Sequence, residues 1–283
     1  MSEILRGAPA AAALDEETTS RASMLLVKGV VPTLAILRVG ERADDVSYER
    51  AAIKRAAKVG VETKNIVLSK NTSQDTLFEE IEKLNADKSV HGVLMFRPLP
   101  NTIDEYAACA ALTPEKDVDG ISFKSMAQLY SGIGAGYAPC TAQSVMELLK
   151  YYAVELSGKR AVVVGRSLVI GRPVAMLLME ANATVTLCHS KTARLQEVMR
   201  EADIVVAALG RAEMLGTEYF RTGQTVIDVG VNWSEKKQKF VGDVDFDAVL
   251  PKVRAITPVP GGVGSVTTAV LCRHIVEAAE RAV

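Results

Sequence analysis

The sequence predicts an α/β protein of two domains, each built around a parallel sheet. Two stretches support this: in residues 31–96, and again in residues 159–257, short apolar runs rich in β-branched residues alternate with segments of helical periodicity. The length of 283 residues suffices for two domains of modest size. The alternation therefore predicts both the fold class and the number of domains.

The first series runs helix, strand, helix, strand, helix, strand. An alanine-rich helix carries Tyr48, and the pattern Thr72-Ser73-x-Asp75 is typical of a helix N-terminus. The predicted elements are a helix over 11–29, a strand over 31–40, a helix over 47–60, a strand over 63–69, a helix over 73–85 and a buried strand over 90–96.

The second series follows two turn-rich segments, "RPLPNT" and "LTPEKDVDG", of the kind that often carries function. It consists of a helix over 141–153 and strands over 159–165, 184–190, 202–210, 224–232 and near 254–257. The predicted domains are therefore residues 1–140 and 141–265. The amphipathic helix 266–283 is expected to return and cover the first domain.

Composition narrows the class of partner. The 33 Lys and Arg are scattered and balance 34 Asp and Glu, which argues against nucleic acid or an anionic membrane as the main partner. The longest uncharged run, 125–146, contains three glycines and a proline, so no membrane span is predicted. The four cysteines and three histidines are widely spaced, and no signal peptide is apparent. We expect a cytoplasmic protein with reduced cysteines, no metal site and a small-molecule ligand.

The segment "VVVGRSLVIGRP" (162–173) has the character of a phosphate-binding turn between a strand and a helix. Gly165, Ser167 and Gly171 stand near the glycine positions of the GxGxxG pattern, with serine in second place and a longer reach to the last glycine. Small residues let the backbone approach a pyrophosphate, and the helix N-terminus near Pro173 supplies free N–H groups. The turn predicts a dinucleotide site, with a purely structural turn as the alternative.

The strand that follows favours NADP over NAD. NAD-binding proteins place an acid about 20 residues further on to bind the ribose hydroxyls, whereas NADP-binding proteins supply cations or hydroxyls for the 2′-phosphate. Here the strand ends in His189, Ser190 and Lys191 without an acid, and Arg166 lies in the turn itself. NADP is the predicted cofactor, and NAD or an ordinary solvated loop are the alternatives.

Several segments, in order along nearly the whole chain, resemble the methylenetetrahydrofolate dehydrogenase/cyclohydrolase family. They are "PLP" (98–100), "EKDVDG" (115–120), "PCTAQSVMELL" (139–149), "VVVGRSLVIGRP", "DVGVN" (228–232) and "ITPVPGGVG" (256–264). The resemblance implies an N-terminal α/β folate-binding domain, a C-terminal Rossmann domain and a cleft between them. It also implies a homodimer that oxidises 5,10-methylenetetrahydrofolate to 5,10-methenyltetrahydrofolate by hydride transfer to NADP or NAD.

The same resemblance implies roles for particular residues. Tyr48 stacks on the aromatic part of the folate, and Asp119 accepts N–H bonds from the pterin edge, so these two are the candidate catalytic residues. A core tyrosine and a turn-capping aspartate are the alternatives. Further substrate-binding candidates are Phe96, Arg97, Pro98, Leu99, Pro260, Gly261 and Gly262. Cofactor-binding candidates are Gly165, Arg166, Ser167, Ile170, Ser190, Ala208, Gly210, Val231 and Thr267.

Two positions depart from family members that also hydrolyse the methenyl product. Those members have a lysine four residues after the tyrosine and a glutamine two residues before Pro-Leu-Pro, whereas this chain has Ala52 and Phe96. On a helix, Lys54 lies about 240° round from Tyr48, and Arg55 returns to the same side roughly 10 Å along the axis. An arginine also holds its proton too tightly to exchange it near neutrality.

Hydrolysis needs a positioned water and proton transfers, whereas hydride transfer needs only alignment of two carbons and exclusion of water. The sequence therefore favours a dehydrogenase without cyclohydrolase activity. A bifunctional enzyme whose base comes from elsewhere, and a non-catalytic relative that binds folate or nucleotide, are the alternatives. A short-chain dehydrogenase does not fit, because Tyr48 precedes the phosphate turn by over a hundred residues.

Overall fold

The computed structural model describes residues 2–134 and 136–283, which divide into two compact units. The six-strand unit comprises Met1–Ala12 and Thr141–Thr267, and the three-strand unit comprises Ala13–Cys140 and Thr268–Val283. This differs from the predicted division at the start of the chain. The first residues join the six-strand unit because β1 (Glu3–Ile4) pairs in parallel with β11 (Ala255–Ile256).

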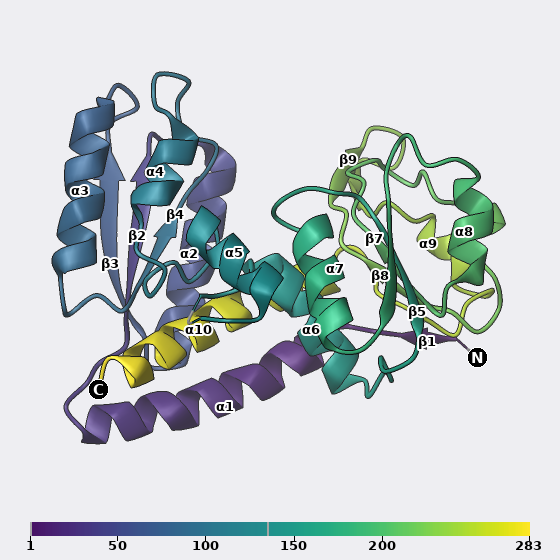
Figure 1. The fold of residues 1–283 in the computed structure, drawn as a ribbon, viewed down its shortest axis with the longest axis horizontal. Coiled ribbons are helices and arrows are strands. Elements are labelled where there is room, and N and C mark those ends of the chain that lie inside the picture. The colour runs from purple at the N-terminus through teal and green to yellow at the C-terminus, as the bar shows by residue number, and fades with distance from the viewer. Residues whose placement is uncertain (1, 135) are drawn as a thin grey trace. The chain divides into compact units, whose positions relative to one another are not determined.

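The six-strand unit has the strand order β1-β11-β8-β7-β5-β6, and every pairing in this sheet is parallel. Its remaining elements are α6 (Cys140–Tyr151), β5 (Arg160–Val164), α7 (Gly171–Glu180), β6 (Thr184–Cys188), α8 (Leu195–Glu201), β7 (Ile204–Ala207), β8 (Thr225–Asp228), β9 (Asn232–Ser234), β10 (Lys239–Val241) and α9 (Phe246–Val249), with short 3₁₀ turns at Thr217–Tyr219 and Val263–Ser265. Figure 1 shows β5, β7 and β8 with α7 and α8 beside them.

Burial explains why these runs form strands of a parallel sheet. All four residues of β7 and of β8 are buried, as are the last four of β5, so both faces of the sheet are covered. The core beneath one face is apolar, with Met199, Phe220 and Val249 wholly buried or nearly so. The turns that follow β5, β7 and β8 are therefore attached to strands that are buried on both faces.

The three-strand unit carries a smaller parallel sheet of order β3-β2-β4. Its elements are α1 (Gly7–Val27), which begins in the other unit, β2 (Thr33–Val39), α2 (Ala43–Lys58), β3 (Glu62–Leu68), α3 (Gln74–Ala86), β4 (Gly92–Met95), α4 (Glu105–Ala111), α5 (Phe123–Ser131) and α10 (Thr267–Arg281). The predicted cap is confirmed: Ser73 Oγ accepts a hydrogen bond from Thr76 N at 3.1 Å where α3 begins.

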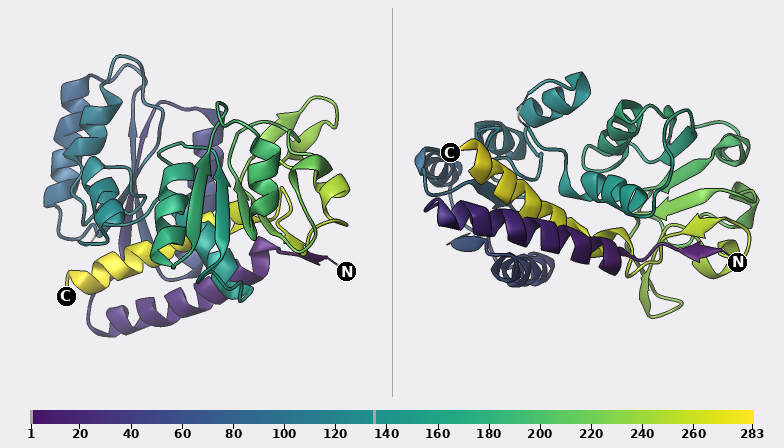
Figure 2. Two further views of the ribbon diagram at one scale, coloured as in Figure 1. Left: turned by 45° about the vertical axis from the view of Figure 1, so that its right-hand side comes forward. Right: turned by 90° about the horizontal axis from the view of Figure 1, so that it is seen from below.

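The last helix is an integral part of the three-strand unit. Figures 1 and 2 show α10 running alongside α1, and Arg21 on α1 donates to both carboxylate oxygens of Glu280 on α10. Gly92, at the start of β4, lies so close to Ile275 of α10 and to Val118 that a Cβ there would overlap both side chains. Among residues 2–134 and 136–283, no helix has both the length and the apolar character that crossing a membrane requires.

Candidate active site

Tyr48 lies in the second turn of α2, where its ring meets an aromatic side chain. The rings of Tyr48 and Phe96 are 5.9 Å apart between centroids and inclined at 81°, so one meets the other edge-on. Phe96 directly follows β4, and both side chains are half-buried. Burial raises the pKa of the Tyr48 phenol well above its ordinary value. The hydroxyl therefore stays protonated and can donate a hydrogen bond.

Buried ion pairs fix the helix that carries Tyr48. Glu49, the next residue, accepts a 2.7 Å bond from Arg38 Nε at the end of β2, and both side chains are largely buried. Nearly two turns further along, Arg55 Nη1 lies 2.8 Å from each carboxylate oxygen of Asp15 on α1. These contacts join α2 to the sheet on one side and to α1 on the other, so the position of Tyr48 is set by several elements.

The basic side chains near Tyr48 are either paired with a carboxylate or exposed to solvent. Ala52, one turn beyond Tyr48, is wholly buried and offers no polar group. Lys54 is exposed, as its angular position on the helix predicts. Arg97, which follows Phe96, places Nη1 3.8 Å from a carboxylate oxygen of Glu105. Each of these basic groups is thus solvated or paired with an acid.

Asp119 lies in the turn-rich segment between α4 and α5 and is held by the start of α6. The backbone N–H of Cys140 donates to Asp119 Oδ1 at 3.2 Å. Burial raises the pKa of the Asp119 carboxyl above its ordinary value, while the bond from Cys140 acts in the opposite direction. The neighbouring carbonyl of Val118 accepts a 2.8 Å bond from Nδ1 of the buried His274. The segment is therefore anchored on both sides of Val118–Asp119.

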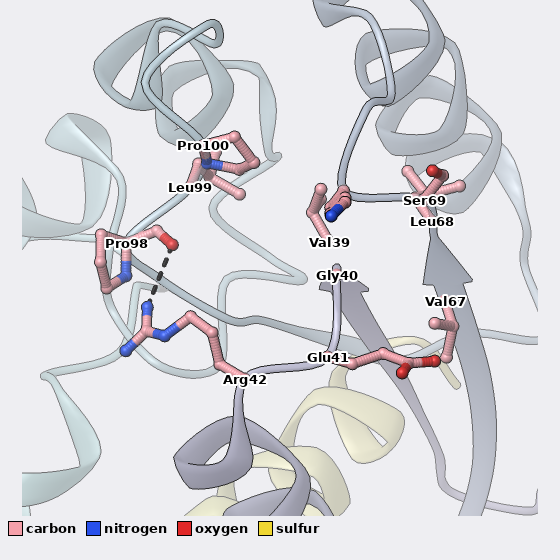
Figure 3. A pocket seen from close by; sticks show the side chains of 11 residues that line it. Val39, Gly40, Glu41, Arg42, Val67, Leu68, Ser69, Pro98, Leu99 and Pro100 are labelled. Carbon is pink, nitrogen blue, oxygen red and sulfur yellow. Dashed lines mark hydrogen bonds between the residues drawn. The ribbon is translucent and has the colours of Figure 1, made fainter.

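A pocket of about 910 Å³ opens at the carboxyl ends of the three strands. In Figure 3, Arg42 points toward Pro98, whose carbonyl accepts a 3.2 Å bond from Arg42 Nη1. Because β3 and β4 flank β2, this edge is a topological switch point, where open α/β sheets bind ligands. The predicted substrate residues Pro98 and Leu99 line this pocket.

The six-strand unit has its own switch point, between β5 and β7, and the predicted dinucleotide turn lies there. Gly165 directly follows β5 with φ of 130°, a conformation that favours glycine, and a Cβ on it would overlap the carbonyl of Ala208, which follows β7. A Cβ on Gly171, at the start of α7, would overlap the carbonyl of Gly165. These two glycines let the turn, the start of α7 and the loop after β7 approach one another closely, as a phosphate-binding turn requires.

The side chains around this turn suit an anionic ligand. Ser167 Oγ accepts a 3.2 Å bond from Ile170 N, which shapes the turn before α7. No side-chain cap covers the N-terminus of α7. Arg166 and Ser190 are exposed and follow the adjacent parallel strands β5 and β6, so both predicted 2′-phosphate ligands lie at the same edge of the sheet. Ala208 and Gly210 follow β7 at that edge too.

The glycine-rich segment before α10 lines a smaller pocket of about 160 Å³ in the six-strand unit. Pro260, Gly261 and Gly262, predicted to bind substrate, share its wall with Val231, predicted to bind the cofactor. The carbonyl of Gly261 accepts a 2.8 Å bond from the N–H of Gly7, which fixes the segment against the start of α1. Thr267, also a cofactor candidate, is buried at the first position of α10.

Two buried acids at this edge, Asp228 and Asp243, were not predicted from the sequence. Asp243 accepts backbone N–H bonds from the loop after β7, and Asp228 accepts them from Gly230 after β8 and from Val244 after β10. A signal was present in the sequence for Asp228: in "VIDVG" one acid stands within an apolar run, where it must find donors if it is buried. Asp243 lacks this signal, because "VGDVDFD" holds three aspartates in alternation. Cys140 and His274, which hold the Asp119 segment, were also missed, because their partners are distant in sequence.

A parallel sheet with a glycine-lined turn and an open helix N-terminus at its switch point is the arrangement of a dinucleotide-binding domain of the Rossmann type. Family models identify the particular family. Residues 5–119 match the tetrahydrofolate dehydrogenase/cyclohydrolase catalytic domain, and residues 139–283 match the NAD(P)-binding domain of the same family. The chain belongs to the tetrahydrofolate dehydrogenase/cyclohydrolase family. The predicted enzyme class, a methylenetetrahydrofolate dehydrogenase, is thereby confirmed.

Relatives match over the whole length. The chain is 49% identical over 281 residues to the bifunctional protein FolD of Carboxydothermus hydrogenoformans, covering 99% of this chain and 98% of the relative. A crystal structure of the bifunctional FolD enzyme of Campylobacter jejuni aligns with a TM-score of 0.97 at 37% identity and covers all of both chains. The Trypanosoma brucei enzyme, complexed with NADP and an inhibitor, aligns with a TM-score of 0.91 at 36% identity, covering 99% and 98% of the two chains.

Proposed function

We propose that this protein oxidises 5,10-methylenetetrahydrofolate to 5,10-methenyltetrahydrofolate with NADP, and that it lacks effective cyclohydrolase activity. The proposed lack of cyclohydrolase activity rests on the contact between Tyr48 and Phe96, together with the buried Ala52 one turn away. Where relatives with both activities are expected to have a lysine and a glutamine, this chain has a methyl group and an aromatic ring.

The folate side of the reaction rests on the three-strand unit. Tyr48 offers a rigid ring face for the aromatic part of the folate and a protonated hydroxyl. The Asp119 carboxyl group is held by Cys140 N and suits the N–H groups of the pterin edge. Neither side chain has to move a proton for a hydride to leave the methylene carbon, because the adjacent folate nitrogens stabilise the cation that remains.

The cofactor side rests on the six-strand unit. When bound, NADP supplies the acceptor for the hydride, which leaves the methylene carbon with both electrons of the C–H bond. Gly165, Gly171 and the open end of α7 suit the pyrophosphate. Arg166 and Ser190 suit the 2′-phosphate, since one is a cation and the other a hydroxyl at the ends of adjacent strands. The NADP complex of the Trypanosoma brucei enzyme supports this choice, with NAD as the alternative.

The loss of hydrolysis follows from what surrounds Tyr48. Opening the methenyl ring requires a water molecule and a group that exchanges protons near neutrality. Lys54 is in solvent, and the guanidinium groups of Arg55 and Arg97 lie by the carboxylates of Asp15 and Glu105. The bulky ring of Phe96 also excludes a hydrogen-bonding amide from its position.

The second candidate is a bifunctional enzyme, and the printed names of its relatives favour it. The relatives from Carboxydothermus hydrogenoformans and Campylobacter jejuni are both called bifunctional. In this alternative, a water network or a group outside the two replaced positions performs the proton transfers.

One preparation assayed for both activities decides between the two. We expect NADPH to form when methylenetetrahydrofolate is added, and methenyltetrahydrofolate to decay at its spontaneous rate. Decay that rises in proportion to protein concentration would establish the bifunctional alternative. Absence of NADPH and NADH formation would refute the dehydrogenase assignment itself. Light scattering on the same sample tests the homodimer, which stays a prediction.

A further inference from the structure

One buried carboxylate ties together the segments that follow two neighbouring strands of the six-strand unit. Asp243 lies between β10 and α9 and is completely buried. Its Oδ2 accepts from Leu209 N at 2.5 Å and from Gly210 N at 3.2 Å. Its Oδ1 accepts from Arg211 N at 2.7 Å and from Asn232 Nδ2 at 3.0 Å. The loop after β7 is thus wrapped around a single carboxylate.

These donors lie beside residues assigned to the cofactor. Ala208 and Gly210 belong to the loop that Asp243 gathers, and Val231 precedes Asn232 after β8. The carbonyl of Ala208 is also the group against which Gly165 of the phosphate turn lies. The Asp243 carboxylate therefore helps to set the shape of this edge of the sheet through the backbone groups that it binds.

A second buried carboxylate holds the backbone that carries Asp243. Asp228, the last residue of β8, accepts from Asp243 N at 3.0 Å, from Val244 N at 2.9 Å and from Gly230 N at 3.1 Å. Gly230 and Gly242 make room for the pair, because a Cβ on Gly230 would overlap the Asp243 carboxyl group and one on Gly242 would overlap that of Asp228. Asp228 at the end of β8 thus holds the backbone of Asp243, and the Asp243 side chain in turn holds the loop after β7.

The number of donors explains why this position needs an aspartate. A carboxylate has two acceptor oxygens with about four lone-pair directions, whereas an asparagine amide has one acceptor oxygen and a donating NH₂ group. In either orientation, an asparagine at 243 would turn a donor toward two of the four N–H groups. Those buried donors would lose their acceptor, and the loop would have to rearrange to satisfy them.

We infer that Asp243 is a positioning residue for cofactor binding: through four N–H bonds it holds the loop 208–211 and Asn232 in the shape that accepts the dinucleotide. The inference rests on the proposed function, since it takes these loops to be the cofactor-binding edge. It predicts an effect on the dinucleotide and not on the folate, because all the groups that Asp243 contacts belong to the six-strand unit.

The test compares Asp243→Asn with the wild-type chain and with Asp203→Asn. Asp203 also accepts a backbone N–H, that of Arg160 at 3.0 Å, but it precedes β7 at the opposite end of the strand. Titration of each full-length protein with NADP and with tetrahydrofolate gives two dissociation constants, and thermal unfolding reports folding. We expect Asp243→Asn to weaken NADP binding by about tenfold or more, with folate binding within about twofold, and Asp203→Asn to change neither.

The outcomes separate the inference from the proposed function. If folded Asp243→Asn binds NADP as tightly as wild type, or weakens NADP and folate equally, the positioning role is wrong. If the wild-type protein binds neither NADP nor NAD, the proposed function falls and the inference with it. Should Asp243→Asn fail to fold, Asn232→Ala carries the test, since it removes one of the four donors. About threefold weaker NADP binding is then expected, and unchanged binding overturns the inference.

Discussion

Phe96 fills the space beside Tyr48, with the two rings inclined at 81° and their centroids 5.9 Å apart. The phenol therefore has an apolar neighbour at the position where the sequence comparison with hydrolysing family members predicts an amide. Ala52, one helical turn from the tyrosine, is wholly buried, so the second polar group is replaced by a methyl group packed inside the protein.

Introducing both polar groups tests whether these two positions account for the proposed lack of cyclohydrolase activity. We expect Ala52→Lys alone to leave methenyltetrahydrofolate hydrolysis within about tenfold of wild type, because a lysine at a buried site without an amide partner lacks a positioned water. Ala52→Lys combined with Phe96→Gln should hydrolyse at least about tenfold faster than either single variant. The rate of loss of methenyltetrahydrofolate absorbance measures this. Full hydrolysis by the single lysine variant would contradict the account.

Replacing the cation of the phosphate turn tests the choice of cofactor. Arg166→Ala should raise the KM for NADP by about tenfold or more and leave that for NAD within about twofold, because only NADP carries the 2′-phosphate. Arg160→Ala is the matched control, since Arg160 is also exposed but begins β5, at the opposite end of the strand. If wild type is more efficient with NAD, or if both variants behave alike, the assignment of Arg166 is wrong.

The carboxylate of Asp119 can be tested separately from the cofactor. Asp119→Asn keeps the size of the side chain but leaves one acceptor oxygen, so the KM for methylenetetrahydrofolate should rise by about tenfold or more. The dissociation constant for NADP should stay within about twofold, because Asp119 and the dinucleotide turn belong to different units. A rise in both constants would indicate a general loss of structure, and a rise in neither would remove Asp119 from the site.

His274 makes stability depend on pH. Burial lowers the pKa of its imidazole to about 3, from about 6.5 in the unfolded chain. Between these values the unfolded chain binds the extra proton, so this contribution to stability is complete above pH 6.5 and is lost as pH falls. Between pH 7 and pH 5 the free energy of unfolding should fall by about 2 kcal/mol through His274.

Denaturant unfolding at the two pH values measures this loss. His274→Gln should be less stable than wild type at pH 7 but should lose less between pH 7 and pH 5. His189→Gln, in the other unit, is the matched control. An equal loss in wild type and His274→Gln would show that another group carries the pH dependence.

The longer elements could be predicted because local signals and burial agree in them. The predicted cap at Ser73 is present, and the apolar runs at β5 and β7 are buried strands. The predicted strand 224–232 is in part wrong: β8 ends at Asp228, whose carboxylate accepts from Gly230 N, and Asn232 begins β9 in another sheet. Apolar periodicity gives no sign of such an end, because it is set by a side chain that binds backbone groups distant in sequence.

Site residues could be predicted where the residue type itself reveals the role. They could not be predicted where the role depends on contacts with segments distant in sequence. Gly165 and Gly171 could be identified because close backbone contact requires glycine, and the contacts with Ala208 and Gly165 supply the reason. Asp243 could not, because its role depends on four donors from two other segments. The short α4 and α5 were also missed, since each is stabilised mainly by a cap and by packing within the turn-rich region.

The pairing of β1 with β11 has a consequence for how this chain is made. Residues near the start of the chain hydrogen-bond to Arg254 and Ile256, roughly 250 positions later, so the sheet edge cannot be completed while the ribosome is still translating the middle of the message. Residues 3–5 are therefore synthesised long before their pairing partners and can join the sheet only after residues 254–256 have been made. A circularly permuted chain that placed them directly after the C-terminal segment would remove that delay only by separating β1 from α1.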